Sequence, residues 1–145
     1  VEPREDRRAA VAGMGAGVVD RLERQAVADA LGVEGADAVF VCTSDREAIA
    51  GSLDLAAPGG VVQLFAPTPP GELVGLDLGT AFFREVTLQS TYSAGPYDTR
   101  EALGLLRAGT VDVGAVVTHR LPLELAQEAY ELAGSGRAMK VVVEL

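Results

Sequence analysis

The run AVFVC at residues 38–42 decides the fold of this chain. An uninterrupted apolar run of this length is typical of a parallel strand that is buried on both faces. The polar residues after it predict a helix, with Ser44 and Glu47 in the capping-box spacing at its start. The glycines of PGG at residues 58–60 end that helix, and VVQLF at residues 61–65 predicts the next strand. This strand, helix and strand predict a βαβ crossover in a mainly parallel sheet.

The same alternation continues on both sides of the βαβ unit. A helix is predicted at residues 3–14, and a second helix starts at Asp20, which has Glu23 in capping-box spacing. The segment APTPPGE at residues 66–72 is too rich in proline for regular structure. A third strand is predicted at residues 86–93. We therefore expect an α/β domain with a doubly wound parallel sheet.

The last third of the chain has a different sequence pattern, in which polar turns flank the predicted helices and strands. The elements predicted there are helices at residues 99–108 and 122–133 and extended runs at residues 116–118 and 140–143. This change predicts a domain boundary near Ser93. Residues 1–92 then form one domain, and residues 93–145 form an α+β segment.

Composition and charge exclude several classes of partner. The chain has 145 residues, 48% hydrophobic and 23% charged, as in an ordinary globular domain. A net charge of -9 disfavours binding to nucleic acid or to an anionic membrane. The single cysteine cannot form an internal disulfide, and no segment approaches the roughly 20 apolar residues of a membrane span. We expect a cytoplasmic protein whose partner is a small molecule.

The start of the chain predicts a candidate nucleotide contact. Val1 and Glu2 are expected to end a strand, because Pro3 can open the following helix. In dinucleotide-binding units an acid at this point accepts hydrogen bonds from the ribose, about 20 residues after a glycine-rich phosphate turn. Glu2 occupies the position of that acid, although the local pattern alone is explained more simply by an ordinary surface carboxylate.

The strand and glycine turn that would precede Glu2 are not in this sequence, which begins at Val1 without a methionine or a leader. In the strand order 3-2-1-4-5-6 the first strand lies in the middle of the sheet. We therefore expect a truncated start and an incomplete Rossmann-like sheet that lacks its first strand and its glycine loop.

Metal and nucleophile chemistry have little support in the sequence. A catalytic zinc takes three protein ligands, and this chain has one cysteine, Cys42, and one histidine, His119. Cys42 lies in an apolar strand without a nearby basic residue, and no serine occupies a G-x-S-x-G turn. We expect neither a metal site nor a catalytic residue in this chain.

In order and spacing, the segments resemble the C-terminal part of the medium-chain alcohol dehydrogenases, in the zinc-dependent polyol, threonine and sugar-alcohol branch. The resemblance is carried by VEPREDRRAAVAGMGAGVVD at residues 1–20, GADAVFVCTS at 35–44, PGGVVQLF at 58–65, FREVTLQSTYSAG at 83–95 and VVTHRLPLELAQEAYELAGSGRAMKVVV at 116–143. It covers essentially the whole chain. It implies that residues 1–92 belong to the coenzyme domain and residues 93–145 to the GroES-like catalytic domain.

The resemblance also implies a set of cofactor-binding residues. These are Glu2 and Arg7 at the adenosine ribose, Thr43 in the cofactor cleft, Phe65, Ala66, Ser90 and Tyr92 at strand ends whose backbone orients the nicotinamide carboxamide, and Lys140 near the pyrophosphate. The implied cofactor is NAD, with NADP as the alternative. The implied zinc belongs to the parent enzyme, because the zinc ligands, proton relay and glycine loop of the family have no counterpart here. We therefore expect the chain alone to be inactive.

Three functions remain open from the sequence. The first is part of a dehydrogenase that oxidises a secondary alcohol of a polyol, sugar or amino alcohol. The second is part of an S-adenosylmethionine-dependent methyltransferase, which shares the acid and the PGG turn but would end in an antiparallel hairpin. The third is a non-catalytic dimerisation or binding remnant, for which the apolar residues 76–88 with Phe82 and Phe83 are suited. We expect the parent protein to be a homodimer or homotetramer.

Overall fold

The structure is a computed structural model that describes all 145 residues. The chain divides into two compact units, Val1–Ser93 and Ala94–Leu145. This division falls one residue after the boundary expected from the sequence. The assignment of the two units to a coenzyme domain and a catalytic domain remains a prediction.

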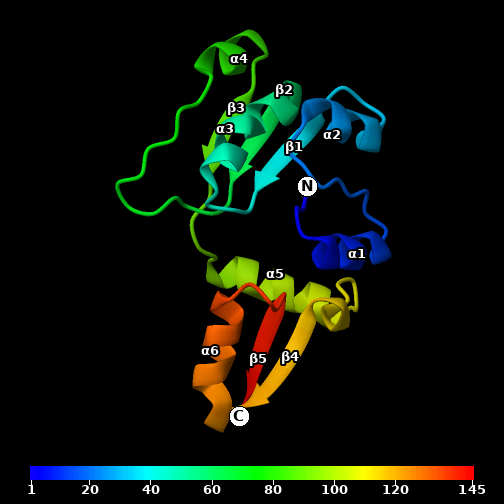
Figure 1. Cartoon of the computed structure of the whole chain (residues 1–145), viewed down its shortest axis with the longest axis vertical. Coiled ribbons are helices and arrows are strands. Elements are labelled where there is room, and N and C mark those ends of the chain that lie inside the picture. The colour runs from blue at the N-terminus through cyan, green and yellow to red at the C-terminus, as the bar shows by residue number, and fades with distance from the viewer. The chain divides into compact units, whose positions relative to one another are not determined.

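The first unit is built on a parallel sheet of three strands in the order β1-β2-β3 (Figure 1). These strands are β1 (Ala36–Val41), β2 (Ala56–Leu64) and β3 (Thr87–Ser90). Their C-terminal ends are in register, with Val41 opposite Leu64 and Leu64 opposite Ser90. The parallel sheet and the βαβ crossover predicted from the sequence are thus confirmed.

The core of the first unit lies between this sheet and α3 (Arg46–Leu55). Ile49 and Leu53 of α3 are buried against Val41 and Val62 of the strands. The opposite face of β1 is different, because Ala38 is exposed and the side chain of Phe40 is 66% exposed. The prediction that this strand is buried on both faces is therefore wrong, and only its α3 face is covered.

Both capping boxes predicted from the sequence are wrong. Helix α2 (Arg24–Leu31) begins after Glu23, whose side chain makes no cap hydrogen bond. Helix α3 is capped by Asp45, whose carboxylate accepts from the backbone N–H of Ala48 at 2.8 Å. Asp45 takes this place because its own N–H donates to the hydroxyl of Thr43, and the resulting turn moves the start of the helix beyond Ser44.

β2 starts five residues earlier than the strand expected from the sequence, directly after α3. The PGG segment lies inside the strand and bends it, with Gly59 at a φ of 74°. Gly60 lies too close to the backbone of Ala57 for a larger residue, since a Cβ there would lie 2.8 Å from the carbonyl oxygen of Ala57. The guanidinium of Arg84 fixes the junction by donating to the carbonyl oxygens of Leu53 and Ala56.

Residues 65–77 connect β2 to the short helix α4 (Leu78–Phe83) without a helix or strand of their own. The side chains of Val74 and Leu76, at the end of this loop, pack on the core. Asp77 caps α4 by accepting from the N–H groups of Gly79 and Thr80 and from the Thr80 hydroxyl. These hydrogen bonds, led by the one from the Thr80 hydroxyl, lower the pKa of the Asp77 carboxyl.

The second unit is a smaller α/β arrangement. Its elements are α5 (Pro96–Arg107), η1 (Val113–Ala115), β4 (Val117–Pro122), η2 (Leu123–Leu125), α6 (Ala126–Gly134) and β5 (Lys140–Glu144). β4 and β5 pair in parallel, and Ala129 of α6 is buried. This parallel pair differs from the antiparallel hairpin that a methyltransferase would have. The helix expected from residue 122 begins as the 3-10 turn η2, because Pro122 ends β4 in the extended conformation.

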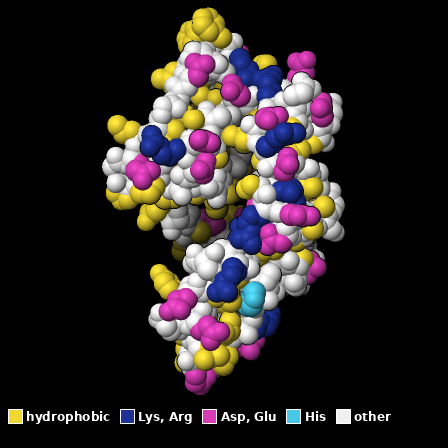
Figure 2. Space-filling model, in the orientation of Figure 1, with side chains coloured by type: hydrophobic (Ala, Val, Ile, Leu, Met, Phe, Trp, Pro, Cys, Tyr) yellow, Lys and Arg dark blue, Asp and Glu magenta, His cyan; other side chains and the backbone are white.

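The surface carries many apolar side chains among the charged ones (Figure 2). Phe82 and Phe83 of α4 are 76% and 86% exposed and meet edge to face. They are therefore not core residues, and a subunit contact remains the prediction for them. No helix in the structure has the length and apolarity needed to cross a membrane.

Candidate functional site

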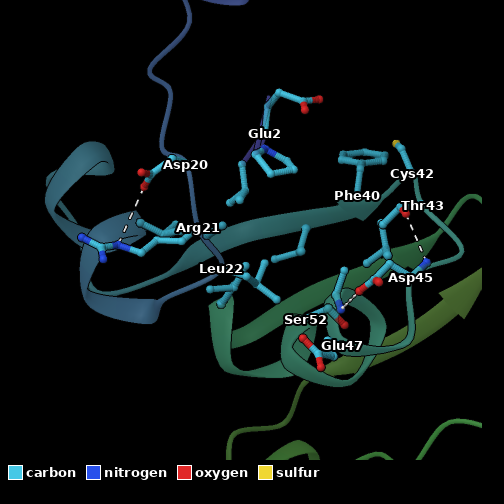
Figure 3. Close-up of a pocket in the computed structure, with 18 of the residues that line it drawn as sticks. Glu2, Asp20, Arg21, Leu22, Phe40, Cys42, Thr43, Asp45, Glu47 and Ser52 are labelled. Carbon is cyan, nitrogen blue, oxygen red and sulfur yellow. Dashed lines mark hydrogen bonds and ion pairs between the residues drawn. The ribbon is translucent and has the colours of Figure 1, made fainter. Parts of the chain in front are cut away.

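A cavity of the first unit lies beside β1 and has a volume of about 770 Å³. Its walls come from the chain start, from residues 20–22, from β1 and the loop after it, and from the buried side of α3 (Figure 3). Three of the predicted cofactor residues, Glu2, Arg7 and Thr43, line this cavity together. Residues that are far apart in the sequence are thus brought to one site.

The chain start is held in place by its backbone. The N–H of Glu2 donates to the carbonyl oxygen of Val19 at 3.0 Å, which joins the first residues to the segment after α1 (Glu5–Gly13). The guanidinium of Arg8 donates to the carbonyl oxygens of Glu2 and Pro3 at 2.9 and 2.6 Å. These bonds fix the position of Glu2 at the rim of the cavity.

The Glu2 carboxylate is half-buried and already partly engaged. Its Oε1 accepts from the backbone N–H of Arg4 at 3.0 Å. Figure 3 shows Glu2 on the same side of β1 as Phe40 and Cys42. A carboxylate has about four lone-pair sites, so this group retains capacity to accept hydrogen bonds from a ligand.

Charges of both signs line the cavity. Glu2, Asp20, Asp45 and Glu47 contribute carboxylates, and Arg4, Arg7 and Arg21 contribute guanidinium groups. Arg21 forms long ion pairs with Asp20 and Glu23, and Arg4 forms a short one of 2.7 Å with Asp6. The hydrogen bond from Arg4 lowers the pKa of the exposed Asp6 carboxyl. The site therefore offers both carboxylate acceptors and guanidinium donors to a polar ligand.

The loop after β1 forms the far end of the cavity. Its Thr43 Oγ1 accepts from the N–H of Asp45 at 3.1 Å, and Asp45 in turn caps α3. Cys42 is exposed beside Thr43. This loop therefore presents a hydroxyl, a thiol and a carboxylate at the end of a parallel strand, where ligands of open α/β sheets bind.

Phe65 and Ala66 lie at the end of β2, next to this loop. Both backbone N–H groups donate to the carbonyl oxygen of Val41, at 3.0 and 3.3 Å. A ligand at this position would therefore meet their carbonyl oxygens and not their N–H groups. The Phe65 side chain is 64% exposed.

The remaining predicted residues are not among those that line the cavity. Ser90 ends β3 opposite Leu64, and the Tyr92 side chain beyond it is 97% exposed. Lys140 begins β5 in the second unit, where its carbonyl oxygen accepts from the Thr118 hydroxyl. A role of these three residues at the cofactor remains a prediction.

Sequence reasoning missed several residues of the cavity. Asp20 was expected to cap a helix, yet its carboxylate lies at the cavity wall beside Arg21. Asp45 and Phe40 were also missed. Asp45 could have been found from its position two residues after Thr43, near the end of the strand. No local sequence pattern distinguishes Phe40 from its neighbours in the apolar run.

The structure brings together no group of three His, Cys, Asp or Glu side chains that could hold a metal ion. Cys42 lies in the first unit and His119 in the second, where its ring contacts the Thr118 hydroxyl. No group of three such side chains is thus available as the donor set of a zinc site.

Comparisons with known proteins agree with this fold. The family model for zinc-binding dehydrogenases matches residues 1–108. L-threonine 3-dehydrogenase of Bacillus licheniformis is 35% identical over 112 residues, which are 76% of this chain and 32% of that enzyme. The same enzyme of Stenotrophomonas maltophilia is 30% identical over 91% of this chain and 39% of its own length.

Solved structures show the same fold. A putative zinc-binding dehydrogenase from Sinorhizobium meliloti, bound to NADP, has a TM-score of 0.87 at 24% identity, over 99% of this chain and 44% of that one. An alcohol dehydrogenase from Thermus sp. ATN1 has a TM-score of 0.83 at 24% identity, over 99% of this chain and 42% of its own. The chain thus spans about a third to two fifths of the curated relatives quoted above. By the family match over most of its length, the chain belongs to the zinc-binding dehydrogenases.

Proposed function

We propose that this chain supplies the adenosine side of the coenzyme site in a nicotinamide-dependent, zinc-type dehydrogenase. The substrate is a secondary alcohol of a polyol, a sugar or an amino alcohol. The observation that supports this proposal best is the cavity beside β1, in which Glu2, Arg7 and Thr43 meet. The threonine dehydrogenases among the relatives support the amino-alcohol branch.

Each residue has a definite task in this proposal. Glu2 accepts hydrogen bonds from the ribose hydroxyls, since its carboxylate is fixed at the rim, where Oε1 accepts from the N–H of Arg4. Arg7 places a positive charge beside the adenosine, and Thr43 offers its hydroxyl at the strand end. When bound, the coenzyme supplies hydride transfer, and this chain holds and orients it.

NAD is the expected coenzyme, with NADP as the alternative. A carboxylate at the ribose accepts both hydroxyl hydrogens of NAD but would repel the 2′-phosphate of NADP. Two unit charges at about 4 Å repel by about 4 kcal/mol at an effective dielectric of 20. Arg4 and Arg7 near Glu2 offset part of this repulsion, and the Sinorhizobium meliloti protein with this fold is bound to NADP. We therefore propose a preference for NAD and not an absolute selection.

The chain alone is proposed to be inactive, because no three His, Cys, Asp or Glu side chains come together in it to hold a zinc ion. Zinc would polarise the alcohol oxygen in the whole enzyme, and its ligands would come from outside this chain. We further propose that the whole enzyme works in the cytoplasm as a homodimer or homotetramer, with Phe82 and Phe83 at a subunit contact.

The proposal can be tested by NMR titration of the 145-residue chain with ADP-ribose up to millimolar concentration. We expect weak binding, with amide shifts confined to the cavity residues. Glu2→Gln should abolish these shifts, because an amide accepts fewer hydrogen bonds than a carboxylate. Glu5→Gln, at the exposed first turn of α1, is the matched control and should leave them unchanged. Shifts elsewhere, or shifts unaffected by Glu2→Gln, would show that Glu2 is not the ribose ligand.

A further inference from the structure

The guanidinium of Arg4, at the cavity wall, is held by the carboxylate of Asp6. Its Nε donates to Oδ1 at 3.1 Å, and its Nη2 donates to Oδ2 at 2.7 Å. Two such bonds in parallel fix the orientation of a guanidinium more firmly than a single bond does. Arg4 lines the cavity, whereas Asp6, in the first turn of α1, is not among the lining residues. The pair therefore joins a charged residue of the wall to a carboxylate outside the cavity.

Arg4 is also anchored beside Glu2, the residue proposed to bind the adenosine ribose. The backbone N–H of Arg4 donates to Oε1 of Glu2 at 3.0 Å. The hydrogen bond to Asp6 raises the pKa of Arg4, and the negative charge of Glu2 adds to this effect. A phosphate on a ribose bound at Glu2 would therefore lie near the side chain of Arg4.

The donors of Arg4 that Asp6 engages are those that a phosphate would need. A guanidinium binds phosphate, like carboxylate, through two parallel hydrogen bonds, and an arginine beside the ribose can accommodate the 2′-phosphate of NADP. In this chain Nε and Nη2 of Arg4 both donate to Asp6. The carboxylate of Asp6 and a 2′-phosphate thus require the same donors.

We propose that Asp6 is a specificity-determining residue, which favours NAD over NADP by competing with the 2′-phosphate for the guanidinium of Arg4. This inference rests on the proposed coenzyme site at Glu2 and adds a second determinant to it. Glu2 repels the phosphate directly, whereas Asp6 acts through Arg4 and needs no contact with the coenzyme. Asp6 is in this sense a positioning residue.

The expected size of the effect follows from the exposure of the ion pair. The side chains of Arg4 and Asp6 are 39% and 61% exposed. Exposed ion pairs are weak, so removal of the Asp6 charge should change the relative affinity for the two kinds of nucleotide by about two- to fivefold. This range is consistent with a preference for NAD and not with an absolute selection.

The test uses two nucleotides that differ only in the 2′-phosphate, adenosine 5′-monophosphate and adenosine 2′,5′-bisphosphate. Each is titrated into the 145-residue chain at a fixed salt concentration, and its dissociation constant is taken from the amide shifts of the residues that line the cavity. The measured quantity is the dissociation constant of the bisphosphate divided by that of the monophosphate. This ratio cancels any effect of a variant on the binding of adenosine itself.

Asp6→Asn removes the ionised carboxylate and should lower this ratio by about two- to fivefold. Glu5→Gln is the matched control, since it removes the same charge from the neighbouring exposed residue of the first turn of α1. It should leave the ratio within about 1.5-fold of wild type, because salt screens an exposed charge. Asp6→Glu keeps a carboxylate and should stay closer to wild type than Asp6→Asn. Equal effects of Asp6→Asn and Glu5→Gln would overturn the proposal, because net charge alone would then explain them.

A double variant tests whether the effect passes through Arg4. Arg4→Gln removes the guanidinium and keeps the backbone N–H that binds Glu2. In this background Asp6→Asn should change the ratio by less than about 1.5-fold, because the two side chains no longer interact. An undiminished effect of Asp6→Asn in the absence of the guanidinium would refute the role given to Asp6.

The outcomes distinguish this inference from the proposed function. If both nucleotides shift the cavity residues but the ratio does not respond to Asp6→Asn, the coenzyme site stands and the role of Asp6 is refuted. If neither nucleotide shifts these residues in any variant, the proposed coenzyme site fails and this inference fails with it. Circular dichroism checks the fold of each variant, and Asp6→Ala, with its high helix propensity, replaces Asp6→Asn if that variant is unfolded.

Discussion

The side chain of Arg84 forms hydrogen bonds to the end of α3 and the start of β2. Its replacement by methionine tests how much these hydrogen bonds stabilise the first unit. The guanidinium donates to the carbonyl oxygens of Leu53 and Ala56. Carbonyl groups at a helix end have no partner within the helix, so they depend on such donors. Methionine keeps much of the apolar stem of arginine and removes both hydrogen bonds.

The size of the effect follows from burial. A hydrogen bond to a charged group contributes about 1.5 to 3 kcal/mol. Arg84 is only half-buried, so water replaces part of the loss. We therefore expect Arg84→Met to lower the free energy of unfolding by about 2 kcal/mol in total. Arg84→Lys, with a single ammonium group, should lose about half as much.

The assay is urea unfolding followed by circular dichroism, with the free energy taken from the midpoint at unchanged slope. The matched control is Arg46→Met, which removes an exposed arginine from the first turn of α3. That change should stay within about 0.5 kcal/mol of wild type. A loss below about 0.5 kcal/mol in Arg84→Met, or the same loss in both variants, would refute the role given to Arg84.

Three further predictions concern the first unit. Gly60→Ala should lower the free energy of unfolding of this unit, measured in urea, by about 1 to 3 kcal/mol, because the new Cβ would press on backbone atoms. The control Gly75→Ala should be nearly neutral, because there is open space around Gly75. The pKa of Asp77 is lowered in the folded chain, so its ionised carboxylate stabilises the fold. This stabilisation is complete above the ordinary carboxyl pKa of about 4, and it is lost as the pH falls through the lower pKa of the folded state. Asp77→Asn should therefore reduce the loss of stability between about pH 6 and about pH 3, and an undiminished loss would contradict the cap. In hydrogen exchange the amide of Phe40 should exchange faster than that of Val39, and equal protection of the two would show that the edge of β1 is not open.

The parallel sheet was predictable because its strands are short apolar runs separated by helices. The ends of the elements were less predictable. Thr43 and Asp45 form a turn of their own, and this moved the cap of α3 away from the pair expected from spacing. Likewise, β2 continues through a glycine pair that usually ends an element, because Gly59 adopts a positive φ and Gly60 fits a close approach.

The candidate site was predicted only in part, because it is formed by segments that are far apart in the sequence. Glu2 was identified from its place at an expected strand end and Thr43 through the resemblance to a family, and both line the cavity. Asp20 and Phe40 were missed because their place depends on long-range packing that no local pattern encodes. The apolar run of β1 predicted burial on both faces, although hydrophobicity alone does not say which face a helix covers.

The loop at residues 65–77 offers a place for protein engineering. Between Pro69 and Glu72 the chain makes one backbone turn, from the N–H of Glu72 to the carbonyl oxygen of Pro69 at 3.1 Å. Loop tips of this kind accept inserted sequences, because lengthening a loop costs little conformational entropy. An epitope tag or a fluorescent protein placed after Gly71 would leave Val74 and Leu76 on the core, whereas the same insertion after Gly75 would pull them from it.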